Sequence, residues 1–107
     1  MIQFIRDAKQ RGYSVTLIYV WLKSVSLAHR RIHHRVAQGG HDIPKDVVRR
    51  RYGRGMANLR SSYIPLADVW YVFDNSGSDP VLVAERQLDC VPVVHLAPVW
   101  KKLWESA

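Results

Sequence analysis

Two pairs of arginines at helical spacing are the residues of this sequence best suited to chemistry. Arg31 and Arg35 are four residues apart, as are Arg50 and Arg54, so each pair shares one face of a helix. A guanidinium group grips phosphate through two parallel N–H donors. Between the pairs stands Gly39-Gly40-His41, where the backbone can approach a ligand closely. Two antiparallel helices joined there would hold several guanidinium groups around one anion, which suits the stabilisation of a transferring phosphoryl group.

The positive charge of the chain is concentrated around these pairs. The 107 residues include 16 Lys or Arg and 9 Asp or Glu, a formal net charge of +7. Residues 29–60 contain nine of the basic and two of the acidic residues, so the whole excess of seven lies there. Because eight of the nine are Arg and acids that would pair with them are scarce, polyanion binding is favoured over a merely solvated helix face. The pattern does not distinguish a nucleotide phosphate from a nucleic-acid backbone.

Other polar residues offer weaker signals. Asp74-Asn75-Ser76 ends a hydrophobic run, where α/β sheets place ligand-contacting groups, although the same residues can simply form a turn. His41 is either a phosphate contact or a capping residue. His29 and His33 have the spacing of metal ligands, but the neighbouring arginines oppose a cation. No metal site is therefore predicted.

Helices and strands of an α/β domain are needed to position these residues. Apolar spacing predicts a first helix over residues 2–11, and the unbroken run SVTLIYVWL at 14–22 predicts a strand covered on both faces. Ser24 can cap a helix that ends near residue 38. A second helix begins near Pro44, with a break or bend expected at Gly53 and Gly55, and Pro65 closes it.

The rest of the sequence predicts strands and a short helix. Residues 68–74 and 81–85 predict a hairpin around the turn at 75–80. Residues 91–96 predict an edge strand because Pro92 cannot donate in a central one, and residues 99–104 predict one or two helical turns. The expected fold is thus α/β, with helices packed on a mostly parallel sheet and a C-terminal hairpin.

Length and composition limit the class of protein. A chain of 107 residues forms one small domain. No apolar run reaches the roughly 18 residues that span a bilayer, and no signal peptide precedes the first helix, so no membrane partner is expected. The lone Cys90 excludes an internal disulfide framework and favours a cytoplasmic location.

A set of short motifs resembles the C-terminal half of the zeta-toxin-like P-loop kinases, closest to the bacterial subgroup of predicted ABC-type ATPases. In order, they are GY before a hydrophobic strand, R-I-x-x-R-V, G-G-H-D-I-P, R-R-R-Y-x-R, N-L and D-N-S. The resemblance covers residues 1–87, with an Arg-rich, lid-like helical pair at 24–64, and leaves residues 88–107 unassigned. It implies a partial P-loop NTPase-type three-layer sandwich, with ATP and Mg²⁺ as cofactors and a nucleotide-sugar or similar small molecule as phosphoryl acceptor.

The resemblance also implies roles for individual residues. By motif position, Arg35, Arg50, Arg51 and Arg54 contact the phosphates of ATP, and the weaker candidates are Arg31, His41 and Asn75. The sequence has no G-x-x-x-x-G-K-[ST], so the lysine and the Mg²⁺-binding hydroxyl of the family are absent, and no catalytic residue is assigned. The chain is therefore expected to be a fragment that does not transfer phosphate by itself.

The same resemblance implies partners for the chain, and two alternative functions stay open. The family implies an antitoxin or a separately encoded N-terminal half, and the sheet edge left bare could pair two copies of the chain. The alternatives are a basic protein that binds nucleic acid electrostatically and an interaction module that pairs with a missing N-terminal half or an antitoxin.

Overall fold

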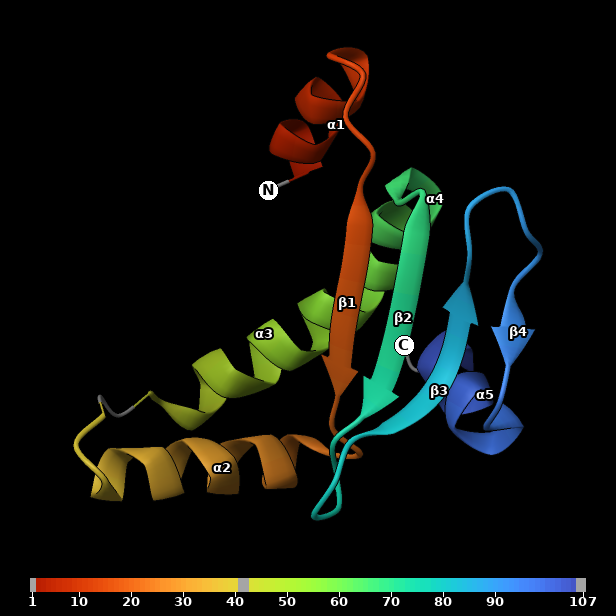
Figure 1. The fold of residues 1–107 in the computed structure, drawn as a ribbon. Helices are drawn as coiled ribbons and strands as arrows, with labels where there is room; N and C mark the ends of the chain where they lie inside the picture. Colours follow the sequence, from red (N-terminus) through yellow and green to blue (C-terminus); the bar gives the residue numbers. More distant parts are fainter. Residues whose placement is uncertain (1, 41–42, 106–107) are drawn as a thin grey trace.

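The computed structural model describes residues 2–40 and 43–105, which form an α/β fold around a four-stranded mixed sheet (Figure 1). The strands lie in the order β1 (Thr16–Trp21), β2 (Val69–Asp74), β3 (Val81–Arg86) and β4 (Val93–Val94). Strands β1 and β2 are parallel, whereas β3 is antiparallel to both β2 and β4. The α/β class and the hairpin are confirmed.

The prediction of a mostly parallel sheet is wrong. A parallel pair needs a crossover connection of a dozen or more residues, and only the segment between β1 and β2 is that long. The turn at 75–80 is too short for a crossover, so β3 must run back along β2.

The four predicted helices are present with similar bounds: α1 (Ile2–Gln10), α2 (Val25–Ala37), α3 (Lys45–Asn58) and α5 (Ala97–Glu105). A short helix that was not predicted, α4 (Ile64–Leu66), includes Pro65, so Pro65 does not close the helix as expected. Ser24 caps α2 as expected, because its Oγ accepts a hydrogen bond from the Leu27 N–H at 3.1 Å.

The irregularity expected in the second basic helix lies later in the chain than predicted. Helix α3 runs unbroken through Gly53 and Gly55 and then widens into a π-helical segment, η1 (Leu59–Tyr63). A Cβ at Gly55 would lie 3.4 Å from the Tyr19 hydroxyl, at the limit of ordinary van der Waals contact, and a Cβ at Gly53 would meet nothing within 4 Å. Pro65 has no N–H and crowds the turn before it, which the wider i→i−5 turn accommodates.

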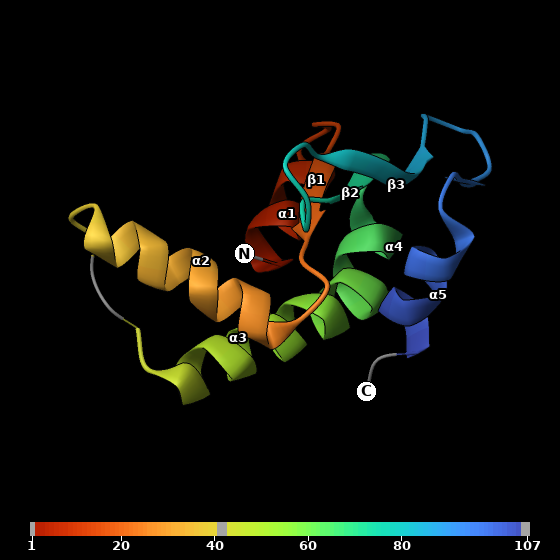
Figure 2. The ribbon, with the colours of Figure 1, turned by 90° about the horizontal axis from the view of Figure 1, so that it is seen from below.

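One face of the sheet carries the core. Seen along the strands, α3, α4 and α5 lie on the same side of the sheet (Figure 2). Trp70 of β2 and Leu103 of α5 are each 1% exposed, and the Trp70 and Trp100 rings stack with centroids 5.5 Å apart. The guanidinium of Arg60 in η1 donates to the Leu103 carbonyl at 2.6 Å. Residues of the segment 88–107, which the resemblance left unassigned, are thus part of the core.

The opposite face of β1 is open. Ile18 and Val20 are 64% and 53% exposed, and β1 is an edge strand of the sheet. The expectation that this strand is covered on both faces is therefore wrong. A three-layer sandwich would place a second layer of helices over these two side chains. No helix among the described residues lies there. Across the described residues, no helix has both the length and the apolar character needed to cross a membrane.

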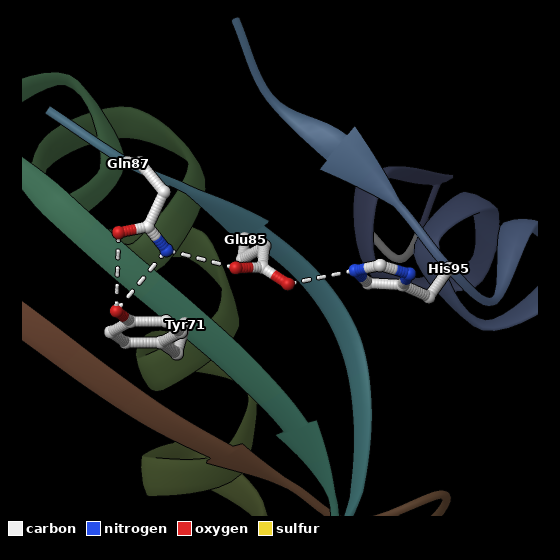
Figure 3. A network of polar contacts seen from close by, with 4 residues as sticks. All are labelled: Tyr71, Glu85, Gln87 and His95. Carbon is white, nitrogen blue, oxygen red and sulfur yellow. Dashed lines mark hydrogen bonds and ion pairs between the residues drawn. The ribbon is translucent and has the colours of Figure 1, made fainter. Parts of the chain in front are cut away.

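A chain of polar side chains ties the last two strands together on the sheet (Figure 3). The His95 ring nitrogen Nε2 lies 2.8 Å from one oxygen of Glu85, and the Gln87 amide donates to the other at 2.9 Å. The same Gln87 amide donates to the Tyr71 hydroxyl at 3.2 Å. The hydrogen bond with His95, and after it the one from Gln87, lower the pKa of Glu85. Both carboxylate oxygens are engaged, so we assign the cluster to anchoring the two-residue strand β4.

Candidate anion site at the carboxyl ends of the parallel strands

The parallel strands β1 and β2 end side by side. Trp21 is in register with Asp74, and the Asn75 N–H donates to the Trp21 carbonyl at 2.9 Å. Just beyond, the Lys23 N–H donates to the Ser76 hydroxyl at 2.9 Å. The carboxyl ends of neighbouring strands are where open α/β sheets place their ligand sites. The predicted position of Asp74-Asn75-Ser76 at the end of a strand is confirmed.

Helix α2 starts at this edge and is fastened to it by Arg31. One guanidinium nitrogen of Arg31 donates to the Asn75 carbonyl at 3.0 Å and lies 3.4 Å from the carbonyls of Ser76 and Gly77. The hydroxyl of Tyr52 in α3 donates to the Leu22 carbonyl at the end of β1. Arg31 is thus a positioning residue that sets α2 against the turn between β2 and β3.

A cationic hollow of about 400 Å³ opens between α2 and the strand ends. We call it the strand-end hollow, and its lining residues are Val20, Leu22, Arg31, His34, Arg35, Gln38 and Asn75. No acidic residue is among them. The Arg35 guanidinium is exposed and makes no hydrogen bond or ion pair with any residue in the described ranges. Its donors are free to bind an anion.

The structure brings together three of the predicted site residues, places a fourth in an adjoining hollow and separates Arg50 and Arg54 from them. Arg31, Arg35 and Asn75 all line the strand-end hollow. Arg51 lines a hollow between β1, α2 and α3 that shares Val20 and Leu22 with the strand-end hollow. Arg50 lines a different hollow at the start of α3. Arg54 is exposed one helical turn beyond Arg50. The two arginine pairs therefore do not surround one anion in this conformation.

One predicted residue lies outside the described part of the chain, and two others were missed. His41 is not among residues 2–40 and 43–105. His34 and Gln38 line the strand-end hollow, and the Gln38 amide nitrogen lies 3.2 Å from the His34 ring nitrogen. His34 follows Arg31 by three residues, and Gln38 follows Arg35 by three, so all four lie on one side of α2. The same spacing rule that paired the arginines would have found them.

The donor set fits phosphate and does not fit Mg²⁺. Guanidinium and amide groups are hydrogen-bond donors for phosphate oxygens. Magnesium requires oxygen ligands, carboxylates above all, and no carboxylate lines the hollow. In the described ranges, no three His, Cys, Asp or Glu side chains come together in a way that could hold a metal ion.

Two partly buried tyrosines, Tyr19 of β1 and Tyr52 of α3, line the adjoining hollow between β1, α2 and α3. Burial, together with the neighbouring Tyr52, raises the pKa of Tyr19 to about 12. Burial also raises the pKa of Tyr52. Both hydroxyls therefore remain protonated at neutral pH, and neither contributes negative charge near the arginines.

Comparisons with known proteins leave the family open. An uncharacterized protein of Haemophilus influenzae is 40% identical to this chain over 52 residues. The matched segment is 49% of this chain and 37% of the relative, so the chain spans well under two thirds of that protein's length. No protein-family model matches the chain, and no solved structure matches it.

Proposed function

We propose that this domain binds the phosphates of a nucleotide, ATP first of all, in the strand-end hollow. The single observation that carries the proposal is the Arg35 guanidinium, which has no partner among the described residues and faces a hollow at the carboxyl ends of two parallel strands whose described lining includes no acid. In this arrangement Arg35 is the phosphate ligand, and Arg31 holds α2 in place. The sequence resemblance to zeta-toxin-like kinases supports ATP over other phosphorylated ligands.

Under this proposal the chain is the lid-bearing, C-terminal half of a kinase with a P-loop NTPase-type fold. Mg²⁺ and the phosphoryl acceptor would be held by residues of an N-terminal half, because the sequence has no Walker A lysine and the hollow has no carboxylate. The chain alone is expected to bind nucleotide without transferring phosphate. A separately encoded N-terminal half or an antitoxin is the partner that the resemblance favours.

Nucleotide titration followed by amide proton–nitrogen correlation spectra tests the proposal. Addition of ATP to the full chain should shift amide signals around residues 31–38 and 75–77. Arg35→Ala should weaken ATP binding about tenfold or more, because a hydrogen bond between charged groups contributes roughly 1.5–3 kcal/mol. Arg6→Ala, an exposed arginine on α1, is the matched control and should bind like the wild type. Absence of shifts in that region, or equal loss in both variants, would contradict the proposal.

Arg54→Ala separates the two possible arrangements of the arginines. If the strand-end hollow is the whole phosphate site, this variant binds ATP as the wild type does. If the α3 arginines reach the nucleotide, as the resemblance implies, affinity falls as it does for Arg35→Ala. The second result would mean that α3 moves relative to the strand ends when nucleotide binds.

An interaction module is the second candidate function, and the open edge of the sheet favours it. Strand β1 is an edge strand without Pro or a charged residue, and Ile18 and Val20 are exposed on its open face. Native proteins usually protect such edges. Sedimentation of the full chain should then show self-association that Ile18→Lys abolishes. A clean monomer at high concentration would refute this function.

A further inference from the structure

The basic surface has a second concave part, on the side of α2 away from the strand-end hollow. A hollow of about 320 Å³ lies between the first turns of α2 and α3, lined by Val25, Ser26, His29, Arg30, Lys45 and Arg49. A hollow of about 410 Å³ adjoins it, lined by Lys45, Asp46, Arg49 and Arg50. The two hollows share Lys45 and Arg49, and we call them together the α2–α3 groove. It has no residue in common with the strand-end hollow.

The cations of the α2–α3 groove are not neutralised from within the described chain. Arg30, Lys45, Arg49 and Arg50 are exposed and make no ion pair or side-chain hydrogen bond with any described residue. Among the described residues that line the groove, the only carboxylate is that of Asp46. Elsewhere, Lys9 pairs with Asp68, and Arg60 and Arg86 are bonded to carbonyls. Four unpaired cations in one groove repel each other, and a polyanion would relieve that repulsion.

The shape of the groove favours a linear polyanion over a single phosphate. Lys45 and Arg49 are one helical turn apart, about 6 Å along α3, and each borders both hollows. One phosphate in one hollow would leave either Arg30 or Arg50 unpaired, whereas consecutive phosphates of one chain can occupy both hollows. Three of the four cations are arginines, whose planar forks match phosphate oxygens.

Imidazole rings beside the groove favour a single strand. His29 lines the first hollow, and its ring lies parallel to that of His33 within 14°, with centroids 6.5 Å apart. Unstacked bases of single strands pack on flat side chains, including histidine. A duplex would not expose its bases to these rings.

We propose that the α2–α3 groove binds the phosphodiester backbone of a single-stranded nucleic acid, with Arg30, Lys45, Arg49 and Arg50 as phosphate ligands. The inference is independent of nucleotide binding in the strand-end hollow, because the two sites share no residue. Four phosphate contacts predict a slope of log Kobs against log salt of about −2.8, at roughly −0.7 per phosphate of a single strand.

Fluorescence anisotropy with a labelled single-stranded DNA of mixed sequence, measured from low to moderate NaCl, tests the proposal. Arg30→Gln/Arg49→Gln should reduce the slope to about −1.4, since each lost phosphate contact removes about 0.7. Arg6→Gln/Arg11→Gln changes the net charge by the same amount at exposed positions far from the groove, so it should leave the slope unchanged. Circular dichroism verifies that both variants keep the wild-type helix content.

Several results would overturn the proposal. One is a wild-type chain that shows no salt-dependent binding. Another is an equal loss of slope in the two double variants, which would mean that net charge alone is responsible. Displacement of the DNA by inorganic polyphosphate at tenfold lower phosphate concentration would assign the groove to a polyanion without bases. If Arg35→Ala abolishes ATP binding but leaves the DNA slope intact, both sites exist and are separate.

Discussion

Replacing Leu103 by alanine tests whether α5 belongs to the same cooperative unit as the sheet. Leu103 is 1% exposed and belongs to the cluster that contains Trp70 and Val83. Leu→Ala substitutions in well-packed cores cost roughly 2–5 kcal/mol, because apolar burial is lost and a cavity remains. We expect a loss of about 3 kcal/mol, a large part of the roughly 5–15 kcal/mol that stabilises a domain of this size.

Urea unfolding followed by tryptophan fluorescence measures this loss, since Trp70 and Trp100 stack in the same core. The free energy of unfolding of a small domain falls by about 2 kcal/mol per molar urea. The urea midpoint should therefore fall by about 1.5 M, without a change in that slope. Lys101→Ala is the control on the same helix, because its side chain is 73% exposed, and it should shift stability by less than about 0.5 kcal/mol. Equal midpoints for the two variants, or a separate early transition of α5, would refute the view that α5 completes the core.

Three further predictions concern the elements that hold the strand-end hollow. Ser24→Ala removes the cap of α2 and should lower the free energy of unfolding by about 1 kcal/mol in the same urea assay, whereas Ser24→Asp should retain most of it. Arg31→Ala removes the hydrogen bond from α2 to the turn after β2. The lost interaction of roughly 1.5 kcal/mol should speed up hydrogen exchange at the Asn75 amide about tenfold. Unchanged exchange would show that this hydrogen bond does not stabilise the turn. Tyr19 has a pKa raised to about 12, so the folded state keeps a proton that the unfolded state loses above pH ~10. Stability should therefore fall as pH rises from about 10 to 12, and Tyr19→Phe should flatten that fall in melting temperatures.

Local signals in the sequence predict the elements well, because each depends on neighbouring residues. The cap at Ser24 and the hairpin across residues 75–80 are confirmed. The apolar run 14–22 does contain a strand, but its pattern cannot tell whether an element of the same chain covers the second face. Ile18 and Val20 are exposed because no described helix lies over them, which is a property of the tertiary fold.

The continuity of α3 shows how packing overrides propensity. Two glycines in one helix predict a break, since each costs roughly 1 kcal/mol relative to alanine. The helix nevertheless continues through both glycines, and it buries Val48 before them and Met56 after them. Proline acts more predictably, because its missing N–H and its ring constrain any helix. The π-helical turn before Pro65 follows from that constraint.

The division of the basic residues between two sites follows from how α3 is rotated against the core. Arg50 is two residues after the buried Val48, and Arg54 is two residues before the buried Met56. Two residues of an α-helix turn by about 200°, so burial of Val48 and Met56 directs both arginines away from the sheet. The spacing within each arginine pair is a local property and was predictable, whereas the direction in which a pair faces depends on which neighbours the core buries. One basic window in the sequence thereby contributes residues to a hollow at the strand ends and to a separate groove, for which we propose different anions.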